Sequence, residues 1–233
     1  MDASKIGVVF DCDGTLLDSM GVWHGLQNEL AERAGGTLTA DDVAALAPMS
    51  IPECGAFFHE KFGLGESDHE VVGMIDEYML DFYRHRAEAR PGALEFVQGL
   101  AQAGAHLTVA SSSPKPYLMA GIERCGFAPY LERVLSVEDV RSTKREPDVW
   151  DRAREIMGTS KELTWGVEDS AYAIGTLGGA GYRTLAIYDS DDAGTWDALQ
   201  ASVEHAIRSF EDLTVEEFLT WNEQPLFVGT ANK

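Results

Sequence analysis

The chain has 233 residues, enough for one large domain or two small ones, and its 45% hydrophobic and 24% charged content is ordinary for a soluble globular protein. Its formal net charge of −21 argues against nucleic-acid and membrane partners, and no apolar run reaches the roughly 20 residues that span a bilayer. Three widely spaced cysteines and an N-terminus with no room for a signal peptide predict a cytoplasmic protein with free thiols.

An apolar run from Ile6 to Phe10 ends in two carboxylates, Asp11 and Asp13, followed by Gly14. Such a run predicts a buried parallel strand, and in open α/β sheets the chemistry lies just past the carboxyl ends of the strands. Side chains alternate along an extended chain, so both carboxylates should lie on the same side. Two close carboxylates repel unless a cation such as Mg²⁺ lies between them or one holds a proton. The alternative for an isolated pair is a turn rich in aspartate.

The stretch from Asp11 to Thr15 resembles the first motif, D-x-D-G-T, of the haloacid dehalogenase superfamily of phosphohydrolases and phosphomutases. The resemblance implies an α/β fold with a Rossmann-like parallel sheet. It also implies that Asp11 attacks phosphorus to form an aspartyl-phosphate and that Asp13 is the general acid and base. Dehalogenases with this scaffold lack the second aspartate, so Asp13 argues against dehalogenation.

Helical periodicity replaces the strand pattern after Ser19, and no strand signal occurs before Arg90. Apolar positions predict about four helical segments. The first three begin at Met20, Ala40 and Ile51, and the last begins near Val71. This insertion looks like the small helical cap of one subclass of the superfamily. We therefore expect a cap domain over residues 18–87 and a core domain formed by residues 1–17 and 88–233.

Strands and helices alternate in the rest of the chain, which predicts right-handed βαβ crossovers and a parallel sheet. The expected strands are 106–110, 134–136, 164–167 and 183–188. The expected helices are 93–102, 117–125, 147–157, one that ends near 180, and 214–219. The tail after Asn222 carries no clear pattern.

Two further stretches resemble motifs that bind phosphate in this superfamily. Ser111 and Ser112 follow an apolar strand, as in the second motif of the superfamily, in which a hydroxyl and a backbone N–H hold phosphoryl oxygens. Lys144 stands in Lys-Arg-Glu-Pro-Asp, which resembles the third motif except that Arg145 replaces a common proline. The resemblance implies that Lys144 neutralises the nucleophile and the phosphoryl group. Alone, a serine after a strand is usually a turn former, and a lysine at a loop is often solvated.

Glu168 and Asp169 follow the strand that begins at Thr164, and they resemble the acidic fourth motif, which binds Mg²⁺. Adjacent acids at a strand end repel each other without a cation, and Mg²⁺ takes one or two carboxylates together with waters and substrate phosphate. The expected metal site comprises Asp11, Asp13, Glu168 and Asp169, with Asp13 contributing its backbone carbonyl.

The four motifs occur in the expected order and predict a Mg²⁺-dependent phosphatase of a small phosphate ester. The alternative is a β-phosphoglucomutase-like phosphotransferase, and a non-catalytic binding protein with the same fold is a third possibility. Mutases of that type carry a histidine in the first cap helix and an arginine in the cap. Here Trp23 stands at the first position, with His24 beside it, and residues 47–53 contain no arginine. The sequence favours hydrolysis and leaves the ester and the oligomeric state open.

Overall fold

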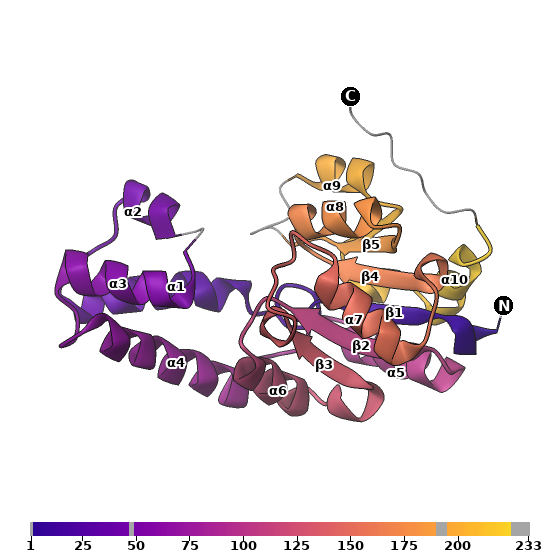
Figure 1. Ribbon diagram of the computed structural model, residues 1–233, viewed down its shortest axis with the longest axis horizontal. Helices are drawn as coiled ribbons and strands as arrows, with labels where there is room; N and C mark the ends of the chain where they lie inside the picture. The colour runs from indigo at the N-terminus through magenta and orange to yellow at the C-terminus, as the bar shows by residue number, and fades with distance from the viewer. Residues whose placement is uncertain (1, 47–48, 190–194, 225–233) are drawn as a thin grey trace. The chain divides into compact units, whose positions relative to one another are not determined.

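The computed structural model describes residues 2–46, 49–189 and 195–224, and the chain separates into two compact units. One unit is formed by Met1–Asp18 and Ala87–Lys233, and the other by Ser19–Arg86. Figure 1 shows that the first contains a sheet flanked by helices and that the second is helical. None of the helices in the described ranges is both long and apolar enough to cross a membrane.

The sheet of the first unit has six parallel strands within the described residues, in the order β3-β2-β1-β4-β5-β6. The strands are β1 (Gly7–Phe10), β2 (His106–Ser111), β3 (Arg133–Ser136), β4 (Thr164–Glu168), β5 (Arg183–Ile187) and β6 (His205–Ile207). The order reverses direction at β1, which has β2 on one side and β4 on the other. This arrangement confirms the predicted α/β fold with a parallel sheet, and it places the switch point of the sheet at β1.

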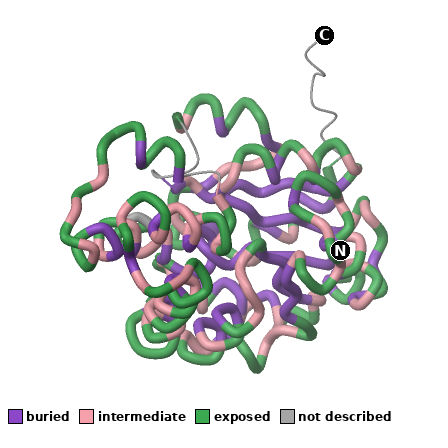
Figure 2. The backbone as a smooth tube through the Cα atoms, turned by 60° about the vertical axis from the view of Figure 1, so that its left-hand side comes forward, coloured by how far each residue is buried: buried purple, intermediate pink, exposed green. Residues whose placement is uncertain are grey.

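Helices cover both faces of this sheet. They are α5 (Ala93–Ala103), α6 (Lys115–Arg124), α7 (Asp148–Met157), α8 (Ala171–Gly179), α9 (Trp196–Ser202) and α10 (Val215–Trp221). A core on one face joins Val9 of β1 to Trp150 of α7 and Leu177 of α8. On the other face, aromatic rings pack together, with Phe218 of α10 lying 5.5 Å from Phe96 of α5 and 5.0 Å from Trp165 of β4, measured between ring centroids. The central strands are consequently buried along their length (Figure 2).

The second unit contains α1 (Met20–Arg33), α2 (Ala40–Leu46), α3 (Ile51–Phe62) and α4 (Asp68–His85). Helix α3 begins with a capping box between Ser50 and Glu53 and ends at Gly63, whose φ is 66°. Gly55 allows α3 and α4 to approach closely, because a Cβ atom there would lie 2.5 Å from Cγ2 of Val72. These four helices match the helical insertion predicted after Ser19.

The two chain segments that connect the first unit to the helical insertion run side by side. Leu17 forms an antiparallel bridge with Ala89, and the backbone N–H of Arg90 donates to the carbonyl of Leu16 over 2.9 Å. The guanidinium of Arg90 donates to the carbonyl of Gly14 (2.6 Å) and to the carboxylate of Asp189 (2.7 Å). Arg90 thereby ties the loop that follows β1 to the carboxyl end of β5.

Helix α9 and strand β6 were not predicted from the sequence. Strand β6 has only three residues, His-Ala-Ile, so it shows neither the length nor the alternation that identifies a strand. It pairs in parallel with β5, with Leu185 opposite His205. The strand is thus defined by its neighbour in the sheet rather than by its own composition. Much of the tail predicted to lack a pattern, residues 225–233, lies outside the described residues.

Candidate active site

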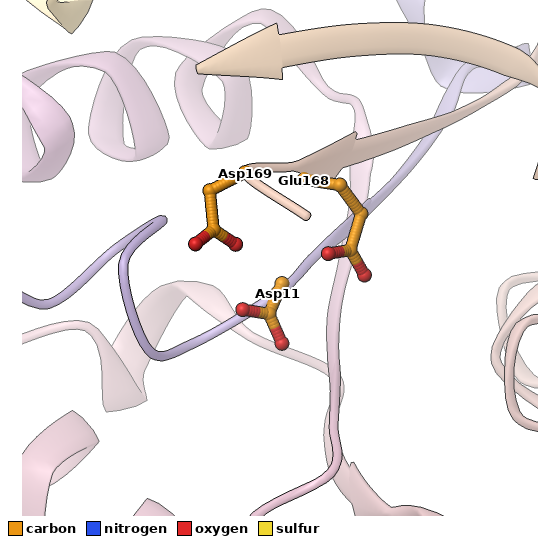
Figure 3. Close-up of side chains that lie close together, drawn as sticks. All are labelled: Asp11, Glu168 and Asp169. Carbon is orange, nitrogen blue, oxygen red and sulfur yellow. The ribbon is translucent and has the colours of Figure 1, made fainter. Parts of the chain in front are cut away.

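Three carboxylates meet at the carboxyl edge of the sheet beside the switch point. Asp11 follows β1 directly, and its backbone N–H donates to the carbonyl of Val167 in β4 over 2.8 Å. That hydrogen bond places Asp11 beside two further acidic residues. They are Glu168, which ends β4, and Asp169, which follows it. One oxygen from each of the three carboxylates lies within 4.8 Å of the others (Figure 3). All three side chains are buried, so this acidic group lies inside the protein.

Lys144 is a cation within this acidic group. Its ammonium group forms ion pairs with Asp11 and with Glu168, the latter at 2.5 Å, and the lysine is only 3% exposed. The proximity of Lys144 to Asp11 is the one expected from the third motif. The lysine comes from the loop before α7, so the β3-to-β4 crossover delivers it to the edge where β1 and β4 end.

The charges of the group are not balanced by Lys144 alone. Burial raises the pKa of Asp11, and it raises the pKa of Glu168 and of Asp169 well above their ordinary values. The repulsion between Asp11 and Asp169 adds to the effect, while Lys144 opposes it. Burial by itself would lower the pKa of Lys144, but Asp11 and Glu168 hold it above its ordinary value, so the lysine stays charged. The acidic group therefore has the electrostatics of a site that gains stability from another cation.

These donors fit a magnesium ion. They are all carboxylate oxygens, which Mg²⁺ prefers, and they converge closely enough to contact one ion. The group contains neither histidine nor cysteine, the usual ligands of zinc. The carboxylate of Asp13 is not a member of this group, so an Asp13 ligand would have to be the backbone carbonyl, as the sequence prediction specifies.

Asp13 lies close to the serines that follow β2 instead. Its Oδ2 atom accepts a hydrogen bond of 2.6 Å from the hydroxyl of Ser113. The backbone N–H of Ser113 donates in turn to the hydroxyl of Ser111, over 3.1 Å. Ser111 is buried at the end of β2, next to β1, whereas Ser112 is exposed. The structure thus brings Asp13 and Ser111 to the same edge as the acidic group.

Two polar side chains at this edge were not predicted to have a role. Thr15 donates to Oδ1 of Asp169 over 3.3 Å, and Ser113 donates to Asp13. Thr15 belongs to the quoted first motif and Ser113 to the run Ser111-Ser112-Ser113, so both positions were visible in the sequence. Their partners were not, because each contact joins residues at least 100 positions apart.

Cys12 stands between Asp11 and Asp13 but faces the core. It is fully buried, and burial together with the charges of Asp13 and Asp11 raises the pKa of its thiol well above the ordinary value. The thiol therefore stays protonated and does not compete with the carboxylates as a nucleophile.

Replacing Lys144 by methionine is expected to destabilise the metal-free protein by about 3 kcal/mol at pH 7.5, because buried carboxylates lose their cation. The loss should shrink at pH 5. Without Lys144 the pKa values of Asp11 and Glu168 rise further, so these groups take up protons and shed the charge that needed a partner. Urea denaturation at both pH values, with a chelator present, measures the difference in unfolding free energy.

Lys161→Met is the matched control for that comparison. Lys161 pairs with Asp151 at 2.8 Å, but its side chain is 33% exposed, so its loss should cost less than about 1 kcal/mol. Equal and small losses for the two variants would contradict the view that Lys144 balances buried charge.

Comparisons with known proteins agree with the fold and the motifs. A family model described as haloacid dehalogenase-like hydrolase matches residues 7–181. Hexitol phosphatase A of Escherichia coli is 26% identical over 219 residues, covering 90% of this chain and 93% of that protein.

Two solved structures show the same fold. CbbY from Rhodobacter sphaeroides, solved in complex with phosphate, has a TM-score of 0.72 at 19% identity and covers 89% of this chain and 95% of that one. A β-phosphoglucomutase from Clostridium difficile has a TM-score of 0.71 at 14% identity and covers 93% of this chain and 96% of that one. The family match spans most of the chain and includes all the predicted site residues, so this protein belongs to the haloacid dehalogenase-like hydrolase family.

Proposed function

We propose that this hydrolase is a Mg²⁺-dependent phosphatase that releases phosphate from a small phosphorylated metabolite through an aspartyl-phosphate on Asp11. The observation that carries the proposal is the position of Asp11, which directly follows β1 and lies beside a buried lysine and two further carboxylates. The hexitol phosphatase relative, which covers most of the chain, supports a phosphate ester as the substrate.

Asp11, Glu168 and Asp169 would hold the magnesium ion, with the backbone carbonyl of Asp13 as a further ligand. When bound, Mg²⁺ neutralises negative charge on the carboxylates and on the phosphoryl group. Thr15 donates to Asp169 and orients that carboxylate toward the site. Ligand orientation by such hydrogen bonds is a common feature of metal sites.

Asp11 is the nucleophile. One of its carboxylate oxygens forms a bond to phosphorus while the bond from phosphorus to the alcohol oxygen breaks, and Asp13 gives a proton to that oxygen. In the second step water attacks phosphorus, Asp13 takes its proton, and the acyl phosphate bond breaks to release inorganic phosphate and Asp11. Phosphoryl transfer depends mainly on positioning and on neutralising charge, and these are the tasks assigned to the other residues.

Lys144 and Ser111 hold the phosphoryl group during both steps. Lys144 contacts Asp11 already, so its ammonium group neutralises the nucleophile and lies next to the oxygens of a phosphoryl group bound there. Ser111 would donate its hydroxyl, and Ser112, the next residue, its backbone N–H. Charge-assisted hydrogen bonds of this kind are stronger than bonds between neutral groups.

Hydrolysis is favoured over isomerisation by residues of the cap. A mutase must hold a bisphosphate in two orientations and protect its aspartyl-phosphate from water until the sugar arrives. The cap has Trp23 at the position where mutases of this type carry a histidine, and residues 47–53 contain no arginine to hold a second phosphate. Water is therefore the expected acceptor.

The test is release of inorganic phosphate in MgCl₂ from a panel of sorbitol 6-phosphate, glycerol 3-phosphate, phosphoglycolate and β-glucose 1-phosphate. We expect phosphate release from at least one ester and its loss in excess chelator. A second assay offers β-glucose 1-phosphate with a trace of the 1,6-bisphosphate. Accumulation of glucose 6-phosphate with little free phosphate would favour the mutase instead.

A further inference from the structure

In the proposed mechanism Asp13 must point its carboxyl group at the oxygen that leaves phosphorus, and the Ser113 side chain forms a hydrogen bond to that carboxyl group. Ser113 donates its hydroxyl to Oδ2 of Asp13 over 2.6 Å, a short distance typical of a hydrogen bond to a carboxylate. Ser113 stands two residues beyond β2, whereas Asp13 stands three residues beyond β1. The contact therefore bridges the ends of two adjacent parallel strands.

Ser113 is itself held by hydrogen bonds on both sides. Its backbone N–H donates to the hydroxyl of Ser111, and its carbonyl accepts a bond of 2.9 Å from the hydroxyl of Ser136. Ser136 is fully buried and ends β3, so it provides a rigid base. Hydrogen bonds link the three serines across the carboxyl ends of β2 and β3, and the hydroxyl of Ser113 extends this network to Asp13.

We propose that Ser113 is a positioning residue, which orients the carboxyl group of Asp13 for proton transfer to the leaving alcohol. The proposal rests on the proposed function, since it needs Asp13 to be the general acid. Proton transfer requires the donor within hydrogen-bond reach of the oxygen, so fixing one carboxyl oxygen raises the fraction of Asp13 side chains that are correctly placed. Ser113 acts through Asp13 and carries no proton to the substrate itself.

The role predicts a dependence on the leaving group. An alkoxide is a poor leaving group and needs a proton, whereas p-nitrophenolate leaves without one. The ratio kcat/KM reports the steps up to phosphoryl transfer, so it isolates the acid step from later hydrolysis. Ser113→Ala should therefore lower kcat/KM about tenfold for an alkyl ester and less than about twofold for p-nitrophenyl phosphate.

The experiment measures kcat/KM in MgCl₂ for p-nitrophenyl phosphate and for the alkyl ester of the panel that the wild type hydrolyses fastest. Ser113→Thr retains the hydroxyl and should recover most of the alkyl activity. Ser4→Ala is the matched control, because Ser4 also donates to a carboxylate, that of Asp2 at 2.7 Å, but precedes β1 at the opposite end of the strand. Ser4→Ala should leave kcat/KM unchanged for both esters. Asp13→Asn should show the same preference for the aryl ester as Ser113→Ala, more strongly.

Equal losses for both esters in Ser113→Ala would overturn the proposal and indicate contact with the phosphoryl group or a structural role. No loss for either ester, or no recovery in Ser113→Thr, would overturn it as well. If Asp13→Asn shows no preference for the aryl ester, the acid role of Asp13 is wrong and the Ser113 proposal fails with it. No phosphate release by the wild type from any ester would overturn the proposed function itself, which is a separate result.

Discussion

Asp11→Asn is expected to abolish turnover, with a loss in kcat of about 10⁴-fold or more, because an amide is a poor nucleophile toward phosphorus. The variant should also fail to form a phosphoenzyme. Rapid acid quenching of a reaction with a ³²P-labelled ester, followed by counting of precipitated protein, measures the covalent intermediate directly. Asparagine has nearly the size of aspartate and its carbonyl can still accept from Lys144, so the packing at the end of β1 should be preserved.

The matched control is Asp197→Asn, which makes the same chemical change at an exposed position in α9 and should keep activity within about twofold. Asp13→Asn provides the contrast. It should slow both transfer and hydrolysis while leaving Asp11 able to react. If Asp11→Asn stays active and Asp13→Asn does not, the two aspartates have the opposite roles or the reaction has no covalent intermediate.

Removing divalent cations is expected to abolish activity, and adding Mg²⁺ is expected to stabilise the fold more at high pH than at low pH. Burial raises the pKa of Glu168 and of Asp169 well above their ordinary values. Below about pH 4 these carboxyl groups are protonated in both the folded and the unfolded state, and their contribution to the stability of the metal-free fold is fully present. That contribution is lost as the pH rises through their raised pKa values in the folded state. The metal-free protein should accordingly lose stability between pH 5 and pH 8.

Mg²⁺ requires the ionised carboxylates, so its binding competes with protons and strengthens as the pH rises. At a hundredfold excess over its dissociation constant it should add about 2.7 kcal/mol to the unfolding free energy at pH 8, and much less at pH 5. Urea denaturation with chelator or with MgCl₂ at the two pH values measures both effects. Asp169→Ala should lose most activity and most of the gain from Mg²⁺. Full activity in excess chelator would contradict the proposed metal site.

The sequence by itself determined the class of fold and the candidate positions for the site. Apolar runs such as that before Asp11 predict buried strands because a strand covered on both faces needs continuous apolar side chains. The helical stripes after Ser19 predict the inserted helices for the corresponding reason, since each apolar face must pack against another. Polar residues at strand ends then identify one edge of the sheet, because parallel strands all present their carboxyl ends there. Asp11, Ser111 and Glu168 all stand at the ends of predicted strands, so this reasoning places them at that edge.

The tertiary structure decided which of those side chains touch. Strand order places β2 and β4 on either side of β1, and that order brings Ser113 to Asp13 and Glu168 to Asp11. Periodicity is a property of a few successive residues, so it contains no information about a partner 100 positions away. Strand β6 and the contact from Arg90 to the carbonyl of Gly14 escaped prediction for the same reason. Both depend on neighbours that only the folded chain supplies.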